Sequence, residues 1–141
     1  MFCDIKDKLD DPNVRQILAL SAFDNSPEGM SIKAAEFRRH DAWQLYGWIE
    51  GGEIVGVCGF EVHPDWVEIL NIAVAETARK RGIGGAMVKA LQAKHEMAVE
   101  AETDDDAVEF YRKLGFETTA TQKYGVRRWL CVLETKCKQV N

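Results

Sequence analysis

The chain has 141 residues, enough for one domain with a sizeable apolar core, and its formal net charge at pH 7 is -5. Nucleic acids and anionic membranes are bound through basic surfaces, so this charge argues against both as partners and fits a cationic or amine partner better. No apolar run approaches the roughly 20 residues of a membrane span. The N-terminus also lacks the basic and apolar regions of a signal peptide. We therefore expect a cytoplasmic protein.

The spacing of the cysteines and histidines predicts neither a zinc site nor a disulfide framework. No CxxC, HxxxH or paired Cys/His motif occurs, and thiols in a chain without a secretory leader are expected to be reduced. The histidines are His40, His63 and His95, and the cysteines are Cys3, Cys58, Cys131 and Cys137.

The first 65 residues predict a short strand, two helices and a β-hairpin. Pro12 suits the first turn of one helix, and Ser26 followed by Pro27 is an N-cap signal for the next. Aromatic and branched residues then predict strands over 43–50 and 53–62, joined by a tight turn at two glycines.

The remaining chain predicts alternating strands and helices. The segment WVEILNIAV is nearly all apolar, which is typical of a central strand buried on both faces. The expected elements are a strand over 66–74, a helix over 82–94, a strand over 97–101, a helix over 107–114 and strands over 116–123 and 126–133, the last two around a turn at Tyr124-Gly125. We therefore predict a mixed α/β domain over residues 1–141. Its mostly antiparallel sheet should have about seven strands, with helices on both faces.

The segment Arg79-Lys80-Arg81-Gly82-Ile83-Gly84-Gly85 directly follows the predicted central strand and opens a helix. Free N–H groups at a helix start bind anions, and glycines at 82 and 84 would let the backbone approach a pyrophosphate. The dinucleotide pattern GxGxxG fails because Met87 occupies its third glycine position, and GxxxxGK[ST] is absent. A glycine-containing turn with solvated basic residues remains the alternative.

Two motifs resemble signatures of the GNAT superfamily of N-acetyltransferases. The segment IAVAETARKRGIGGAMVKAL is similar to its acyl-CoA signature, R/Q-x-x-G-x-G/A, with Arg79, Gly82 and Gly84 at the fixed positions. DDDAVEFYRKLGFE is similar to the second signature, A-x-x-F-Y-x-K-x-G-F. Its positions are filled by Ala107, Phe110, Tyr111, Lys113, Gly115 and Phe116. The resemblance is strong from Trp66 to about Phe116 and implies a GNAT-like fold with acetyl-CoA as acyl donor.

The resemblance also implies where the donor lies. In this superfamily the fourth and fifth strands splay apart and the pantetheine arm enters between them, which implies contacts at Ile72, Ala73 and Val74. Pyrophosphate contacts then fall on the segment from Lys80 to Gly85, mostly through main-chain N–H groups, and Arg79 is also expected to bind the cofactor. Asp104 stands where many relatives carry an asparagine that contacts the cofactor arm, and a carboxylate lacks the amide's donors. No metal or redox cofactor is required.

Two residues are candidates for the chemistry. The resemblance makes Tyr111 the acid that protonates the departing CoA thiolate, at the edge of a helical stripe formed by Ala107, Phe110 and Leu114; packing beside Phe110 is the alternative. Glu68 interrupts an apolar strand, so we expect burial to raise its pKa and suit it to a general base. Its position matches a catalytic glutamate of histone-acetylating relatives. The alternatives are exposure by strand twist or pairing with an arginine.

The acceptor is the part that the sequence leaves open. Glu100 and Glu102 share one face of a strand and could line an amine cleft or face water. Thr103 with Asp106 resembles a capping box, and Asn71 is expected to hydrogen-bond locally.

Residues up to about 65 are expected to supply the acceptor side, and residues from about 66 the acyl-CoA side. The expected acceptor is a primary amine of a small molecule or peptide, including a protein N-terminus or lysine. A non-catalytic acyl-CoA-binding or regulatory protein is the rival function, and a nucleotide-binding module is disfavoured. A late strand could pair across a homodimer.

Overall fold

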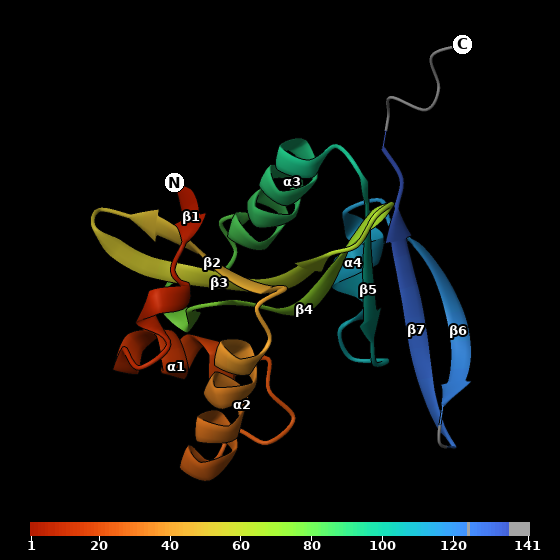
Figure 1. The fold of residues 1–141 in the computed structure, drawn as a ribbon. Coiled ribbons are helices and arrows are strands. Elements are labelled where there is room, and N and C mark those ends of the chain that lie inside the picture. Colours follow the sequence, from red (N-terminus) through yellow and green to blue (C-terminus); the bar gives the residue numbers. More distant parts are fainter. Residues whose placement is uncertain (124, 136–141) are drawn as a thin grey trace.

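The computed structural model describes residues 1–123 and 125–135, and a seven-stranded sheet with the order β1-β2-β3-β4-β5-β7-β6 forms its centre (Figure 1). All neighbouring strands are antiparallel except β4 and β5, which are parallel. The predicted fold class is therefore confirmed. The strands are β1 (Phe2–Asp4), β2 (Trp43–Glu50), β3 (Glu53–Val62), β4 (Trp66–Val74), β5 (Ala98–Thr103), β6 (Glu117–Lys123) and β7 (Val126–Leu133).

Helices cover both faces of the sheet and enclose two apolar cores. One face carries α1 (Pro12–Ala19) and α2 (Pro27–Arg39), and the other carries α3 (Ile83–His95) and α4 (Val108–Lys113). The sequence signals for the first two helices are confirmed: Pro12 and Pro27 open them, and Ser26 accepts a hydrogen bond from the Gly29 N–H. The sequence did not predict the short 3-10 turns η1 (Lys6–Lys8) and η2 (Glu76–Ala78). No helix within the described residues is long and apolar enough to cross a membrane.

Strand β4 contains a bulge that the sequence pattern does not reveal. Gly59 of β3 pairs with Asn71, but the next pair is Phe60 with Ile69, so Leu70 has no partner on β3. A bulge reverses the side-chain alternation beyond it. Accordingly, Val67 and Ile69 share the α3-side core with Ile72 and Val74, whereas Ala73 joins the α1-side core. Glu68 and Asn71 consequently lie on the α1 and α2 side of the sheet.

The buried thiol of Cys58 should make the fold less stable as the pH becomes alkaline. Burial raises the pKa of this thiol to about 12. In the unfolded chain a thiol loses its proton near pH 8.5, so the folded state retains a proton that the unfolded state has lost, and the free energy of unfolding falls as pH rises. We expect the melting temperature to fall between about pH 9 and pH 12, and to fall less steeply in Cys58→Ala. Equal pH slopes for both proteins would contradict this assignment.

Two residues named in the sequence analysis, Cys137 and Tyr124, lie outside the described residues.

Candidate active site

A cavity of about 1110 Å³ lies where β4 and β5 separate. The two strands pair in parallel from Trp66 with Ala98 as far as Ile69 with Ala101. Beyond that point β4 remains paired with β3 only, up to Val74 with Gly56. The edge of β4 that faces β5 is therefore open over its last five residues, and main-chain groups on such an edge can bond an incoming extended chain. Residues 69–74 all line the cavity, including the predicted Ile72, Ala73 and Val74.

The turn between β4 and α3 lies at one end of the cavity. Lys80 and Gly82 both adopt positive φ angles, of 65° and 76°, and α3 begins without any side-chain cap. Left-handed residues in a turn aim successive N–H groups at one point, and an uncapped helix start adds further free donors. The positive φ of Lys80 costs energy in a residue with a Cβ, and the sequence pattern gave no sign of it. The turn therefore presents free main-chain N–H groups of the kind that can bind an anion.

The basic residues of this turn take different positions. Arg79 and Lys80 line the cavity, and the Arg79 Nε–H donates to the Val74 carbonyl at 3.4 Å. Arg81 does not line the cavity, because its guanidinium pairs with Glu50 at the tip of the β2–β3 hairpin. The Arg81 side chain is therefore directed to the hairpin and not to the cavity.

The glycines of the turn serve two purposes. A Cβ at Gly82 would meet no atom within 4 Å, so this residue leaves the cavity open. A Cβ at Gly84 would lie 2.8 Å from Phe110 Cε1, and one at Gly85 would lie 2.9 Å from Leu114 Cδ2. Gly84 and Gly85 line the cavity, yet they also let α3 pack against α4. Gly84 is therefore needed for helix packing as well as for the shape of the cavity.

Tyr111 is held in the apolar core with one side toward the cavity. Its side chain is 5% exposed and packs edge-on against Phe110 and Phe116, with ring centroids 5.0 and 5.2 Å away. Burial raises the pKa of its phenol, and the thiols of Cys58 and Cys131 raise it further. The phenol therefore stays protonated at neutral pH and can donate a hydrogen bond into the cavity that it lines.

The register of α4 differs from the prediction. The buried residues of the helix are Val108 and Tyr111, whereas Ala107 is exposed and precedes the helix. Phe110 and Leu114 are partly buried against the same core. The predicted apolar stripe is therefore rotated, and Tyr111 lies within the buried face instead of at its edge.

Asp104 organises the start of α4 in place of the predicted capping box. Its Oδ1 accepts hydrogen bonds from the main-chain N–H groups of Asp106 and Ala107, at 3.1 and 3.0 Å. Thr103 makes no cap, so the proposed Thr103–Asp106 box is wrong. Asp104 also lines the cavity, and its two hydrogen bonds shape the loop between β5 and α4.

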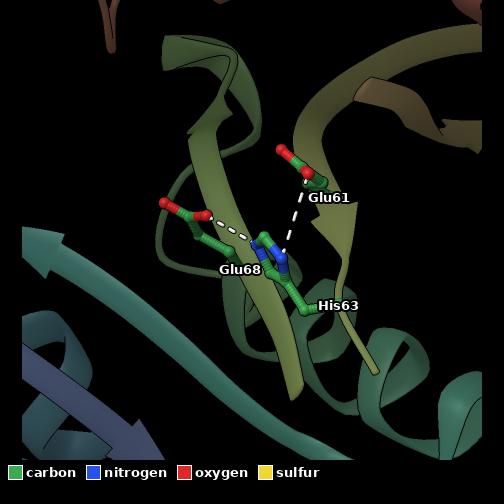
Figure 2. A group of neighbouring side chains, drawn as sticks. All are labelled: Glu61, His63 and Glu68. Atoms are coloured by element: carbon green, nitrogen blue, oxygen red, sulfur yellow. Dashed lines mark hydrogen bonds and ion pairs between the residues drawn. The ribbon is translucent and has the colours of Figure 1, made fainter. Parts of the chain in front are cut away.

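Glu68 lies outside the cavity lining, on the α1 and α2 side of the sheet. Its side chain is 45% exposed, so the expected burial is wrong, and the partner is an imidazole instead of an arginine. One carboxylate oxygen is 2.9 Å from His63 Nε2, and His63 Nδ1 is 3.9 Å from Glu61 (Figure 2). Three potential ligand atoms of this cluster lie within 4.8 Å of one another. The described structure thus brings two carboxylates and one imidazole together beside the turn between β3 and β4.

Residues 12–116 match the family model described as the acetyltransferase (GNAT) family. The chain belongs to this family. None of the curated proteins compared matches the sequence of this acetyltransferase.

Solved structures share the fold of this acetyltransferase at low sequence identity. A GNAT family acetyltransferase from Elizabethkingia anophelis, with acetyl-CoA bound, is 23% identical with a TM-score of 0.65, over 84% of this chain and 88% of that one. The ribosomal-protein-S18-alanine N-acetyltransferase from Escherichia coli is 17% identical with a TM-score of 0.75, over 96% and 93%. The aminoglycoside 6'-N-acetyltransferase from Enterococcus faecium is 16% identical with a TM-score of 0.69, over 95% and 96%. At these identities the likeness establishes the fold alone.

Sequence reasoning missed the part of the acetyltransferase's cavity formed by the segment between α1 and α2. Leu20 to Phe23 line it, and Phe23 is fully exposed. This segment is tied to β4 by a hydrogen bond from the Asn71 amide to the Ser21 hydroxyl at 3.2 Å, so Asn71 bonds across the fold and not locally. Nothing in the sequence pairs residues 21 and 71.

Cationic side chains of the cavity were also missed, although for Lys89 a signal existed. Lys89 lies four residues after Gly85, so both lie on the face of α3 that starts at the glycine-rich turn. Lys113, which belongs to the second signature motif, lines the same cavity. Arg128 and Glu102 also line it, and they pair with each other at 3.4 Å. Glu102 therefore faces the cavity and not only water.

Gly82 offers a test of the anion site that does not disturb packing. Asparagine tolerates the left-handed conformation, so Gly82→Asn should fold and place a side chain where the cavity is open. We expect the affinity for acetyl-CoA, measured by calorimetry, to fall about ten-fold because the side chain excludes the phosphates. The matched control is Gly125→Asn in the β6–β7 turn, where φ is 75° and a Cβ would likewise meet nothing. Equal affinities of the two variants would contradict the assignment.

Proposed function

We propose that this acetyltransferase moves an acetyl group from acetyl-CoA to a primary amine by direct attack in a ternary complex. The observation that carries the proposal is one cavity that joins an uncapped helix start, an open strand edge and a buried tyrosine. A similar structure contains bound acetyl-CoA, which agrees with this donor.

The donor would lie along the cavity in an extended form. The pyrophosphate would accept hydrogen bonds from the main chain between Lys80 and Gly85, where the helix start favours negative charge. The amide groups of the pantetheine arm would bond the open edge of β4 at Ile72 to Val74, as an added strand does. Lys89 and Lys113 supply further positive charge along the same cavity. The thioester would then lie near Tyr111.

The chemistry needs a base for the amine and a proton donor for the thiolate. Glu68 would remove a proton from the ammonium form of the acceptor, through a water, because its carboxylate does not line the cavity itself. The neutral amine would attack the thioester carbonyl, and main-chain N–H groups near Ile72 to Val74 would stabilise the oxyanion. The Tyr111 hydroxyl would then protonate the leaving thiolate, and the second proton that the amine nitrogen releases as the amide forms would restore the phenol.

The acceptor would approach from the side of α1 and α2, with residues 1–65 supplying much of its site. The apolar residues Leu20 and Phe23 lie at this end of the cavity. On the same side of the sheet Glu68 and Glu100 are cross-strand neighbours, and their charges favour a cationic acceptor. Similar structures are named for a ribosomal-protein alanine and for aminoglycosides, so peptide and small-molecule amines both belong in the test.

A panel of amines with acetyl-CoA tests this function, with release of the CoA thiol as the readout. The panel contains aliphatic diamines and polyamines, an aminoglycoside, a peptide with a free N-terminal alanine and a lysine peptide whose N-terminus is blocked. We expect saturable thiol release with at least one amine and none without amine. Tight acetyl-CoA binding with no turnover on any member would instead favour the non-catalytic alternative. Displacement of acetyl-CoA by ATP would favour a nucleotide-binding module.

A further inference from the structure

The imidazole of His63 lies beside the candidate base but has no role in the transfer proposed above. It follows β3 in the turn before β4, and its ring stacks on Trp66 with centroids 4.4 Å apart. The side chain is 24% exposed, and Nε2 lies 2.9 Å from a Glu68 carboxylate oxygen. The ring is thus fixed on one side by an indole and on its edge by the candidate base.

The protonation of this contact follows from the chemistry of the two groups. An ionised carboxylate only accepts hydrogen bonds, so a separation of 2.9 Å requires the proton on Nε2. His63 therefore donates Nε2–H to Glu68. Figure 2 shows the second carboxylate oxygen of Glu68 pointing away from the imidazole. That oxygen is left to accept a proton.

Glu68 needs such a partner because its neighbours repel it. Glu61 on β3 and Glu100 on β5 are its direct cross-strand partners in the register. Like charges directly opposite on one face of a sheet destabilise each other, and a glutamate side chain has several rotamers through which it can move away into solvent. A donor fixed between the carboxylates counters that tendency.

We propose that His63 is the positioning residue of Glu68: its Nε2–H holds one carboxylate oxygen so that the other is directed to take the acceptor's proton through a water. The proposal rests on the proposed function, with Glu68 as its general base. His63 gains or loses no proton in the reaction. The ammonium group gives one proton to Glu68, which returns it to solvent after transfer.

Three variants of His63 and Glu68 test this role in steady-state kinetics with the best amine of the panel. His63→Leu removes the donor, and we expect kcat to fall about ten-fold, as for a misplaced catalytic group, while KM for acetyl-CoA stays within about two-fold. His63→Gln keeps an N–H donor at similar reach and should recover most of kcat. In a Glu68→Gln background, His63→Leu should have no further effect, because it acts through Glu68.

His40 provides a matched control for the loss of the stacked ring. It stacks on Trp43 at 4.4 Å, as His63 stacks on Trp66, but contacts no carboxylate in the described structure. His40→Leu should therefore leave kcat unchanged, and equal melting temperatures would show that both variants fold. Three results would overturn the proposal: a wild-type kcat in His63→Leu, no recovery of kcat in His63→Gln, or losses of kcat that add when His63→Leu is combined with Glu68→Gln. In each case, turnover by the wild-type protein would still uphold the proposed function. A wild-type protein inactive on every amine would overturn the function and the role of His63 with it.

Discussion

Glu68→Gln should lower kcat about 100-fold, the largest loss that we expect from a single side chain, because removal of the general base typically costs this much. The glutamine keeps the length and shape of the side chain and can still accept the hydrogen bond from His63 Nε2, but it takes up no proton at neutral pH. Donor binding should hardly change, since Glu68 does not line the cavity. Steady-state kinetics between about pH 6 and pH 9, with acetyl-CoA affinity measured separately, check both parts.

The control for this variant is Glu53→Gln at the start of β3, which removes an exposed carboxylate beside the β2–β3 turn. It should retain wild-type kinetics. If Glu68→Gln also turns over at the wild-type rate across this pH range, Glu68 is not the base. Glu102, which lines the cavity, would then be the next residue to test.

Tyr111→Phe should lower kcat about ten-fold while acetyl-CoA affinity stays within a few-fold, which is the pattern of an interaction made mainly in the transition state. The thiolate of CoA is a fair leaving group, so the loss falls at the low end for acid catalysis. Packing against Phe110 and Phe116 is preserved, and the melting temperature should change little. Unfolding of Tyr111→Phe, or unchanged turnover, would make the tyrosine structural.

The pH dependence gives Tyr111 a second test. Burial raises the pKa of its phenol above the ordinary value of about 10, so the hydroxyl remains a donor throughout the range in which the enzyme can be assayed. Any loss of wild-type activity between pH 8 and about pH 10 must therefore persist in Tyr111→Phe. A loss that disappears in this variant would show that the tyrosine titrates in that range and that its environment differs from the one described.

The sequence predicted features that depend on local backbone chemistry. Ser26 and Pro27 mark the start of α2 because a side-chain acceptor and a fixed φ both suit the first turn. The glycine-rich turn could be predicted because its glycines follow a strand and open a helix, and in the structure Gly82 adopts a left-handed conformation there. Tyr111 was found through its motif, although the register of its helix was rotated. These signals all lie within a few residues of the feature that they specify.

Features that depend on contacts between distant residues could not be predicted. The bulge at Leu70 arises in the pairing of β4 with β3 and has no signal within β4 itself. Glu68 was expected to be buried because a continuous apolar strand suggested cover on both faces, but the helices α1 and α2 leave it half-exposed beside His63. Gly84 was assigned to phosphate binding alone because its approach to Phe110 requires the packing of α3 on α4.

The central claim is direct transfer from acetyl-CoA to an amine, and intact-mass spectrometry of the enzyme and the acceptor tests it most directly. The enzyme is incubated with acetyl-CoA alone and then with the amine added. We predict an unmodified enzyme and no released CoA in the first step, then one acetylated amine for each CoA released. An enzyme that gains the mass of an acetyl group, or CoA release before the amine is added, would contradict the account.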